Sequence, residues 1–177
     1  MIDTNTSPII VRDALLQDAP CIGVVGMQVF LDTYATEGIR ASIAREVLEA
    51  FSPATIANLM ARPDTSIIVA EVNHHLIGFA QVAMRTAHEL ISTPDAAELQ
   101  RLYVQERFTG RGIGHRLLQE TERYARLGGA SLLWATVWIG NDRALGFYPR
   151  QGYVQMGSPS YSFQDETHEN RLFGKVL

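Results

Sequence analysis

The chain has 177 residues, so we expect a single domain over residues 1–177. Its hydrophobic fraction of 46% and charged fraction of 19% are typical of a globular protein with a full-sized core. The formal net charge is −4 and the basic residues form no tract, which argues against a nucleic-acid partner.

Cys21 is the only cysteine, which rules out an internal disulfide bond and a cysteine-based zinc site. The histidines are scattered, apart from the neighbours His74 and His75, so we expect no metal. The first eight residues lack the basic and apolar regions of a signal peptide, and no apolar run reaches membrane length. We therefore expect a cytoplasmic protein without a membrane partner.

The first half of the chain predicts a strand, three helices and a β-hairpin. Ser52 and Pro53 are typical of a helix N-cap and the first helical position. The expected ranges are a strand at 9–12, helices at 15–34, 39–51 and 53–60, and strands at 66–72 and 76–84 joined by a turn at 73–75.

The second half alternates strands and helices after a polar connection at 86–97. The expected ranges are a strand at 98–104, a helix at 112–127 ended by Gly128 and Gly129, a strand at 131–138, a helix at 141–151 ended by Gly152, and strands at 153–157 and 172–177. This mixed order with an antiparallel start predicts an α+β or mixed α/β fold rather than a doubly wound sheet.

A glycine-rich loop connects the strand that ends at Val104 to the following helix, with Gly110, Gly112 and Gly114 at every second position. Backbone N–H groups of such a loop and the helix N-terminus together favour an anion, most often phosphate. The spacing fits neither the Walker loop nor the dinucleotide pattern G-x-G-x-x-G. A glycine-rich turn without a ligand is the alternative.

The loop resembles motif A of the GCN5-related N-acetyltransferases (GNAT), Q/R-x-x-G-x-G/A, which binds the pyrophosphate of coenzyme A. Gly112 and Gly114 match this motif, while Thr109 stands where Gln or Arg is usual. The difference has little consequence for binding if the loop acts through its backbone N–H groups.

A second segment, N-D-R-A-L-G-F-Y-P-R-Q-G-Y, resembles motif B of the same superfamily, N-x-x-A-x-x-F-Y-x-x-x-G-F/Y. The matching residues are Asn141, Ala144, Phe147, Tyr148, Gly152 and Tyr153. Pro149 interrupts helical hydrogen bonding, so we expect a distorted or shortened helix there. Taken alone, the segment also fits an ordinary amphipathic helix. Two motifs in this order, with a strand between them, favour the family.

Over most of the chain the sequence is similar to bacterial polyamine acetyltransferases of the Pai type. The similarity extends to the FLDTY segment that begins at Phe30, but Gln100 stands where an acid is expected. It implies a twisted, mostly antiparallel sheet splayed at the cofactor site, acetyl-CoA as co-substrate, a small-molecule amine such as spermidine or spermine as acceptor, and a possible homodimer. The implied cofactor-binding residues are Leu102, Tyr103, Val104, Thr109, Gly110, Arg111, Gly112, Ile113, Gly114, His115, Asn141 and Phe147.

Acetyl transfer to an amine needs a base, an acid and an oxyanion donor. The resemblance implies Tyr148 as the acid that protonates the leaving thiolate, and a backbone N–H near Val104 is the candidate oxyanion donor. Glu98 is the candidate base, because strand periodicity places it on one face with Gln100 and Leu102. The alternative for Glu98 is a surface carboxylate paired with Arg101.

Other residues have two interpretations each. Asn141 either anchors the pantetheine arm or caps a helix. Tyr34, Trp134 and Trp138 either line an amine pocket by cation–π contact or belong to the core. Two other functions also fit: acetylation of another acceptor, such as an amino acid, a drug or a protein N-terminus, and a non-catalytic acetyl-CoA sensor.

Overall fold

A computed structural model describes residues 7–163 and 166–177. The strands are β1 (Ile10–Asp13), β2 (Thr65–Val72), β3 (His75–Ala83), β4 (Ala96–Val104), β5 (Leu132–Trp138), β6 (Val154–Gly157), β7 (Ser160–Phe163) and β8 (Glu166–Val176). The helices are α1 (Ala19–Tyr34), α2 (Ala41–Ala50), α3 (Pro53–Met60), α4 (Ile113–Leu127) and α5 (Asp142–Arg150), with 3-10 turns η1 (Leu16–Asp18) and η2 (Glu106–Phe108).

One sheet runs through the molecule in the order β1-β2-β3-β4-β5-β8-β6, and β7 pairs with β8 outside this path. All of these pairs are antiparallel except β4 with β5. The expected mixed α/β fold with a mostly antiparallel sheet is therefore confirmed.

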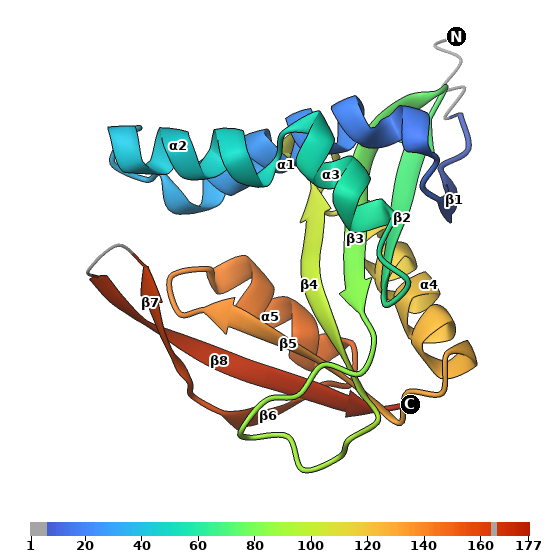
Figure 1. The fold of residues 1–177 in the computed structure, drawn as a ribbon, viewed down its shortest axis with the longest axis vertical. Helices are drawn as coiled ribbons and strands as arrows, with labels where there is room; N and C mark the ends of the chain where they lie inside the picture. Colours follow the sequence, from blue (N-terminus) through green and yellow to red (C-terminus); the bar gives the residue numbers. More distant parts are fainter. Residues whose placement is uncertain (1–6, 164–165) are drawn as a thin grey trace, which may run out of the picture.

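The sheet splays open between β4 and β5 (Figure 1). The two strands pair only from Ala96 opposite Leu132 to Glu98 opposite Trp134, whereas β5 pairs with β8 along its whole length. Within the described chain, the rest of β4 has a strand partner only on its β3 side. Some of its backbone N–H and C=O groups are therefore left to face the gap.

A β-bulge interrupts β4 just beyond the point of divergence. Val82 pairs with Leu99 and Gln81 with Arg101, so Gln100 has no partner on β3. An extra residue reverses the alternation of side chains along a strand. The expectation that Glu98, Gln100 and Leu102 share one face is therefore wrong for Leu102, which packs in the core on the α4 side.

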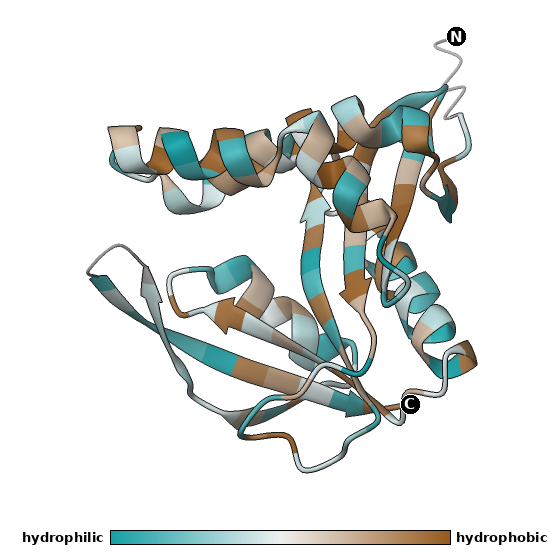
Figure 2. Cartoon of the chain, in the orientation of Figure 1, coloured by the Kyte–Doolittle hydropathy of each residue, from teal (hydrophilic) through white to brown (hydrophobic). Residues whose placement is uncertain are grey.

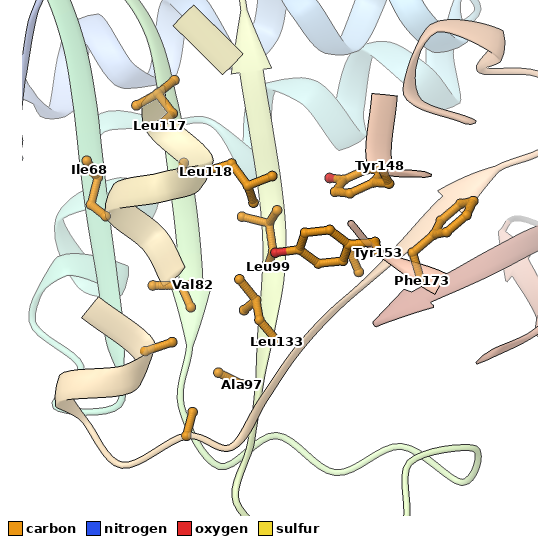
Figure 3. Packing of buried hydrophobic residues seen from close by; sticks show 14 of the residues in the cluster. Ile68, Val82, Ala97, Leu99, Leu117, Leu118, Leu133, Tyr148, Tyr153 and Phe173 are labelled. Atoms are coloured by element: carbon orange, nitrogen blue, oxygen red, sulfur yellow. The ribbon is translucent and has the colours of Figure 1, made fainter. Parts of the chain in front are cut away.

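The helices cover the two faces of the sheet. Helices α1, α2 and α3 bury Ile22, Val47 and Ile56 against β2 and β3. On the other face, α4 buries Leu117 and Leu118 (Figure 3) in the largest hydrophobic cluster. The central strands are largely hydrophobic while the visible surface of α4 is mostly hydrophilic (Figure 2), which is the pattern of a helix that buries one face only.

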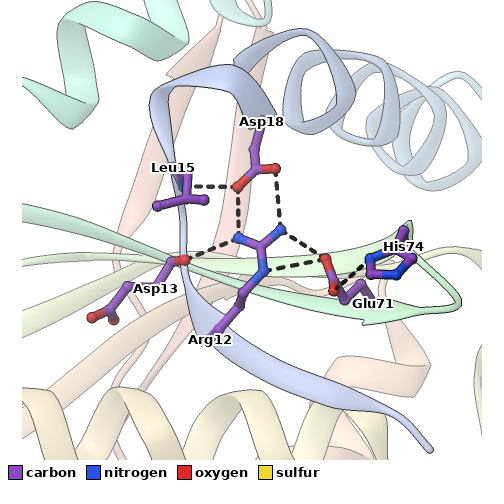
Figure 4. A network of polar contacts seen from close by, with 6 residues as sticks. All are labelled: Arg12, Asp13, Leu15, Asp18, Glu71 and His74. Carbon is purple, nitrogen blue, oxygen red and sulfur yellow. Dashed lines mark hydrogen bonds and ion pairs between the residues drawn. The ribbon is translucent and has the colours of Figure 1, made fainter.

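Arg12 joins β1 to its surroundings by two ion pairs (Figure 4). Its guanidinium lies 2.7 Å from a carboxylate oxygen of Asp18 and 2.7 Å from one of Glu71. The Arg12 hydrogen bond lowers the pKa of Asp18. Asp18 also accepts from the N–H of Leu15 at 2.7 Å, so the network fixes the chain where it enters α1.

A second polar cluster ties α4 to β8. The carboxylate of Glu122 is buried and accepts hydrogen bonds from Lys175 at 2.9 and 3.1 Å and from the phenol of Tyr153 at 3.1 Å. A buried charge is costly unless it is paired, and here both oxygens are satisfied. The cluster holds Tyr153 against the ring of Tyr148, 5.4 Å away.

Several predicted boundaries are wrong in detail. The helix expected from residue 15 begins as η1, and α1 starts at Ala19 with Pro20 in its first turn. Helix α5 continues one residue past Pro149, so the proline does not end it early. Strand β7 was not expected, and β8 starts at Glu166 instead of residue 172. This hairpin is polar and mostly exposed, so it lacks the hydrophobic alternation that marks a half-buried strand.

Candidate active site

A cleft of about 810 Å³ lies where β4 and β5 diverge. Its walls come from the C-terminal part of α1, the end of β4, the glycine loop with the start of α4, and α5. Every predicted cofactor-binding residue lines it except Arg111, whose guanidinium lies 5.4 Å from the ring centre of Phe108. Their roles remain predictions, but the fold brings them together.

The glycine loop has the backbone conformation of an anion site. Gly110 and Gly112 have φ angles of +74° and +77°, which residues with a side chain rarely adopt. Gly112 is the N-cap of α4, and the first helical hydrogen bond runs from the N–H of Arg116 to the carbonyl of Gly112. The first N–H groups of α4 are therefore left without helical acceptors at the cleft wall.

A second helix begins at the same cleft. The side-chain oxygen of Asn141 accepts a hydrogen bond from the N–H of Ala144 at 3.1 Å, so Asn141 caps α5. Capping uses only the oxygen, and within the described chain the amide NH₂ of Asn141 has no partner. The cleft thus receives the positive ends of both α4 and α5.

Two arginines at this end, Arg143 and Arg150, are not among the site residues expected from the sequence. Arg143 donates to both carboxylate oxygens of Glu106, at 2.6 and 2.8 Å, and so connects α5 to η2. The hydrogen bond from Arg143 lowers the pKa of Glu106. Arg150 also lines the cleft, and His115 bonds to Gln151. Arg143 lies inside motif B, but its partner is 37 positions away in the chain.

Tyr148 is buried except at the cleft. Its ring stacks on Phe173 with centroids 5.7 Å apart and meets Tyr153 edge-on (Figure 3). Within the described chain the phenol oxygen has no hydrogen-bond partner, and no buried side-chain oxygen is left unsatisfied, so this oxygen reaches the cleft. Burial raises the pKa of Tyr148, so the phenol stays protonated at neutral pH and can act as a proton donor.

Glu98 lies at the point of divergence, four residues before Leu102 and outside the walls of the cleft. At about 3.3 Å per residue, this places it roughly 13 Å along the strand from Leu102. Burial raises the pKa of Glu98, against the effect of the hydrogen bond from Gln100. Glu98 could therefore take a proton from the cleft only through intervening water.

Three hydrogen bonds connect Glu98 to a cation. Arg101 donates to Gln81 at 2.7 Å, Gln81 to Gln100 at 2.6 Å, and Gln100 to Glu98 at 3.2 Å. All three bonds point the same way, because the guanidinium can only donate and the carboxylate can only accept. The alternative pairing of Glu98 with Arg101 is therefore replaced by an indirect link through two amides.

The three candidate aromatic residues separate into two environments. Trp134 is buried, donates to the carbonyl of Thr86 at 3.2 Å and packs in a small core cluster. Tyr34 lines the cleft, and its ring lies 5.7 Å from that of Trp138. Trp138 reaches the rim, since a side chain at Gly140 in the cleft wall would collide with its indole. The core interpretation thus holds for Trp134 alone.

The helix that supplies Tyr34 also contributes residues that the sequence analysis did not select. Val29, Asp32 and Thr33 line the cleft at helical spacing.

Among the described residues, no group of three His, Cys, Asp or Glu side chains could hold a metal ion. In the same part of the chain, no helix is long and apolar enough to cross a membrane.

Comparison with solved structures shows the same fold. The PaiA N-acetyltransferase from Thermoplasma acidophilum, solved with coenzyme A, is 22% identical with a TM-score of 0.77, over 96% of this chain and 99% of that one. YncA from Salmonella typhimurium, solved with acetyl-CoA, is 17% identical with a TM-score of 0.68, over 96% and 94%.

The sequence relatives cover less of the chain than these structures do. An N-acetyltransferase encoded in the pepI 3′ region of Lactobacillus delbrueckii subsp. lactis is 22% identical over 161 residues, 91% of this chain and 93% of the relative. The N-alpha-acetyltransferase RimI of Mycobacterium tuberculosis is 30% identical over 105 residues, 59% of this chain and 62% of RimI. The model of the acetyltransferase (GNAT) family matches residues 28–153, which is more than half of the chain. The protein therefore belongs to the acetyltransferase (GNAT) family.

Proposed function

We propose that the protein transfers the acetyl group of acetyl-CoA to a primary amine of a small molecule, with a polyamine such as spermidine or spermine as the favoured acceptor. The amine attacks directly in a ternary complex. The observation that carries the proposal is the convergence of two helix N-termini and the phenol of Tyr148 on one cleft.

The cofactor would lie along the basic side of the cleft. The free N–H groups at the start of α4 suit its pyrophosphate, because backbone donors and the helix dipole both favour an anion there. The side-chain NH₂ of Asn141 suits an amide carbonyl of the pantetheine arm. Phe147 packs beside Gly114, 3.7 Å from where a side chain would begin, and so shapes the wall between these two contacts.

The chemistry then proceeds at the end of β4. An alkylammonium group with a pKa near ~10.4 must lose a proton before it can attack, and Glu98 accepts that proton through water. A backbone N–H of β4 near Val104, unpaired on the β5 side, stabilises the negative charge on the carbonyl oxygen. The C–S bond then breaks, the protonated phenol of Tyr148 gives its proton to the departing thiolate, and the nitrogen loses its extra proton to the phenolate as the amide forms.

The choice of a polyamine as acceptor rests on the aromatic residues at the rim of the cleft. The likeness to PaiA concerns the fold, and RimI, an N-alpha-acetyltransferase, is also a relative. Tyr34 and Trp138 at the rim can attract an ammonium group by cation–π contact, which is why we favour a polyamine over a protein N-terminus. The phenol oxygen of Tyr148, which reaches the cleft, favours an enzyme over a non-catalytic sensor.

The test is thiol release from acetyl-CoA with a panel that contains spermidine, spermine, free amino acids, an aminoglycoside and a short peptide with a free N-terminus. We expect the highest kcat/KM with a polyamine, and mass spectrometry should find one acetyl group on its nitrogen. Tight acetyl-CoA binding without release of thiol for any amine would instead support the sensor. A preference for the peptide would place the protein nearer to RimI in function.

A further inference from the structure

Three carboxylates line the cleft, and two of them are stabilised by the protein itself. Glu106 is paired with Arg143. Asp142 lies in the first turn of α5, where the helix dipole favours a negative charge. Asp32 lines the same cleft and is exposed, but among the described residues it has neither an ion-pair partner nor a favourable helix dipole.

Asp32 lies in the last turn of α1, next to the negative end of the helix dipole. That turn contains no basic residue that could offset the charge. Within the part of the chain that the structure describes, no ion pair or hydrogen bond holds the Asp32 side chain. The carboxylate and the last carbonyl groups of α1 therefore create a region of negative potential that a cationic ligand would neutralise.

The neighbours of Asp32 suit an organic cation. Thr33 on the same helix face uses its hydroxyl to donate to the carbonyl of Val29 at 2.8 Å, so Asp32 carries the only free charge on that face among the described residues. Tyr34 lines the same cleft, and its ring centre lies 5.7 Å from that of Trp138. Aromatic faces attract ammonium groups, and more strongly when water is partly excluded.

The charges of the cleft are divided between its two ends. The basic side chains of the cleft, His115, Arg143 and Arg150, belong to the α4 and α5 side, where an anionic cofactor would lie. Asp32 belongs to the α1 side. On the α4 and α5 side, Glu106 and Asp142 offset these positive charges, so Asp32 is the carboxylate left to attract a second positive charge of an acceptor.

We propose that Asp32 binds a second, non-reacting ammonium group of the acceptor, so that the enzyme selects diamines and polyamines over monoamines. This inference rests on the proposed function, since it assigns a specificity role within the same cleft. One amine attacks the acetyl group beside Tyr148 while Asp32 and the rings of Tyr34 and Trp138 hold the other.

The test compares Asp32→Asn with the unmodified protein at saturating acetyl-CoA. The acceptors are n-butylamine, 1,4-diaminobutane, 1,8-diaminooctane and spermidine, so that one or two ammonium groups are presented at different separations. We expect Asp32→Asn to lower kcat/KM about tenfold for the best diamine or polyamine, through KM, and to change the n-butylamine value less than twofold. Asp32→Glu should recover part of the loss and shift the optimum separation.

Asp95→Asn is the matched control, because it removes the same charge from an exposed residue outside the cleft. It should leave all four values unchanged. An equal loss for n-butylamine and spermidine in Asp32→Asn would overturn the proposal, because it would indicate a general effect on the helix. No loss for any acceptor would overturn it as well.

Equilibrium binding of spermidine, measured by calorimetry with coenzyme A present, separates this proposal from the proposed function. Binding by the unmodified protein that weakens in Asp32→Asn, without acetylation of any amine, would support the Asp32 site and refute the amine acetyltransferase. Acetylation of all amines without preference for a second charge would refute the Asp32 site alone. Neither binding nor acetylation of spermidine would refute both.

Discussion

The two ends of the cleft are built from different parts of the protein. At the proposed cofactor end, the backbone N–H groups at the start of α4 and the cap of α5 are separated in the sequence by one helix and one strand. At the acceptor end, the contributors are side chains from α1 and the end of β5, about a hundred residues apart. The proposed donor site therefore depends on local backbone conformation, whereas the proposed acceptor site depends on tertiary packing.

The largest effect on turnover is expected from Tyr148→Phe. Removing the phenol leaves the departing thiolate without its proton donor, so kcat should fall by roughly 10²-fold at constant acetyl-CoA affinity. Tyr153→Phe is the matched control, because it removes a phenol from the adjacent ring and loses only the bond to Glu122. If the two variants show the same kcat, Tyr148 has no chemical role.

The next largest effect tests the backbone site. Gly112→Ala should raise the Kd for acetyl-CoA about tenfold, because the φ of +77° is strained by roughly 1–2 kcal/mol for a residue with a side chain. Gly129→Ala is the control, since Gly129 has a φ of +88° at the far end of α4, also with open space around it. Both variants should lose similar thermal stability, but calorimetry should find weaker acetyl-CoA binding only in Gly112→Ala. Equal Kd values would mean that the loop does not hold the cofactor.

A pH profile tests the amide chain that leads to Glu98. In Gln100→Glu the hydrogen bond that lowers the pKa of Glu98 is replaced by a like charge, so that pKa should rise further. A base works only when deprotonated, so the acidic limb of the kcat/KM profile should move to higher pH, and Glu98→Gln should abolish that limb. Gln105→Glu makes the same change beside Gln28, away from the hydrogen bonds that lead to Glu98, and should leave the pH profile of kcat/KM unchanged. An unmoved limb in Gln100→Glu would exclude Glu98 as the base.

The smallest effect on turnover, but a large one on stability, is expected for Arg12→Leu. Two largely buried carboxylates would lose their cation, which should lower the free energy of unfolding by about 3 kcal/mol and leave kcat unchanged. Because the folded pKa of Asp18 is lowered, its share of stability is present above the unfolded pKa and is lost as pH falls through the folded pKa. Denaturation in urea at pH 7 and pH 3 should therefore show a smaller difference between the variants at pH 3. Arg62→Leu, which breaks an exposed pair with Asp64, should change the free energy of unfolding far less than Arg12→Leu does.

The sequence was informative where structure is local. Helix caps, glycine positions and strand ranges follow from neighbouring residues, and the fold class and the family were predicted correctly. The bulge at Gln100 is different: the adjacent polar residues Gln100 and Arg101 interrupt the alternation of β4, but which residue is unpaired depends on the register with β3. The β7–β8 hairpin was incomplete in the prediction, since its exposed polar residues follow no core-facing pattern.

In the site, too, features set by neighbouring residues were predicted and features set by tertiary contacts were not. The glycine loop and motif B lie near each other in the chain, so the residues that line the cofactor end were selected in advance. Asp32 and the partnership of Glu106 with Arg143 were not, because their significance depends on what the fold brings beside them. The indirect link between Arg101 and Glu98 likewise passes through Gln81 on another strand.

Lys175 is the only lysine in the chain, and its nitrogen donates to both oxygens of Glu122. Acetyl-CoA bound to an acetyltransferase can also react with lysines of the enzyme itself. An unpaired lysine near the cleft would therefore compete with the acceptor as a nucleophile. The amino group of Lys175 is held in an ion pair with the buried carboxylate of Glu122, and 28% of the lysine side chain is exposed. The protein is therefore poorly suited to acetylate its own side chains, and an intact-mass spectrum after long incubation with acetyl-CoA should show no lysine modification.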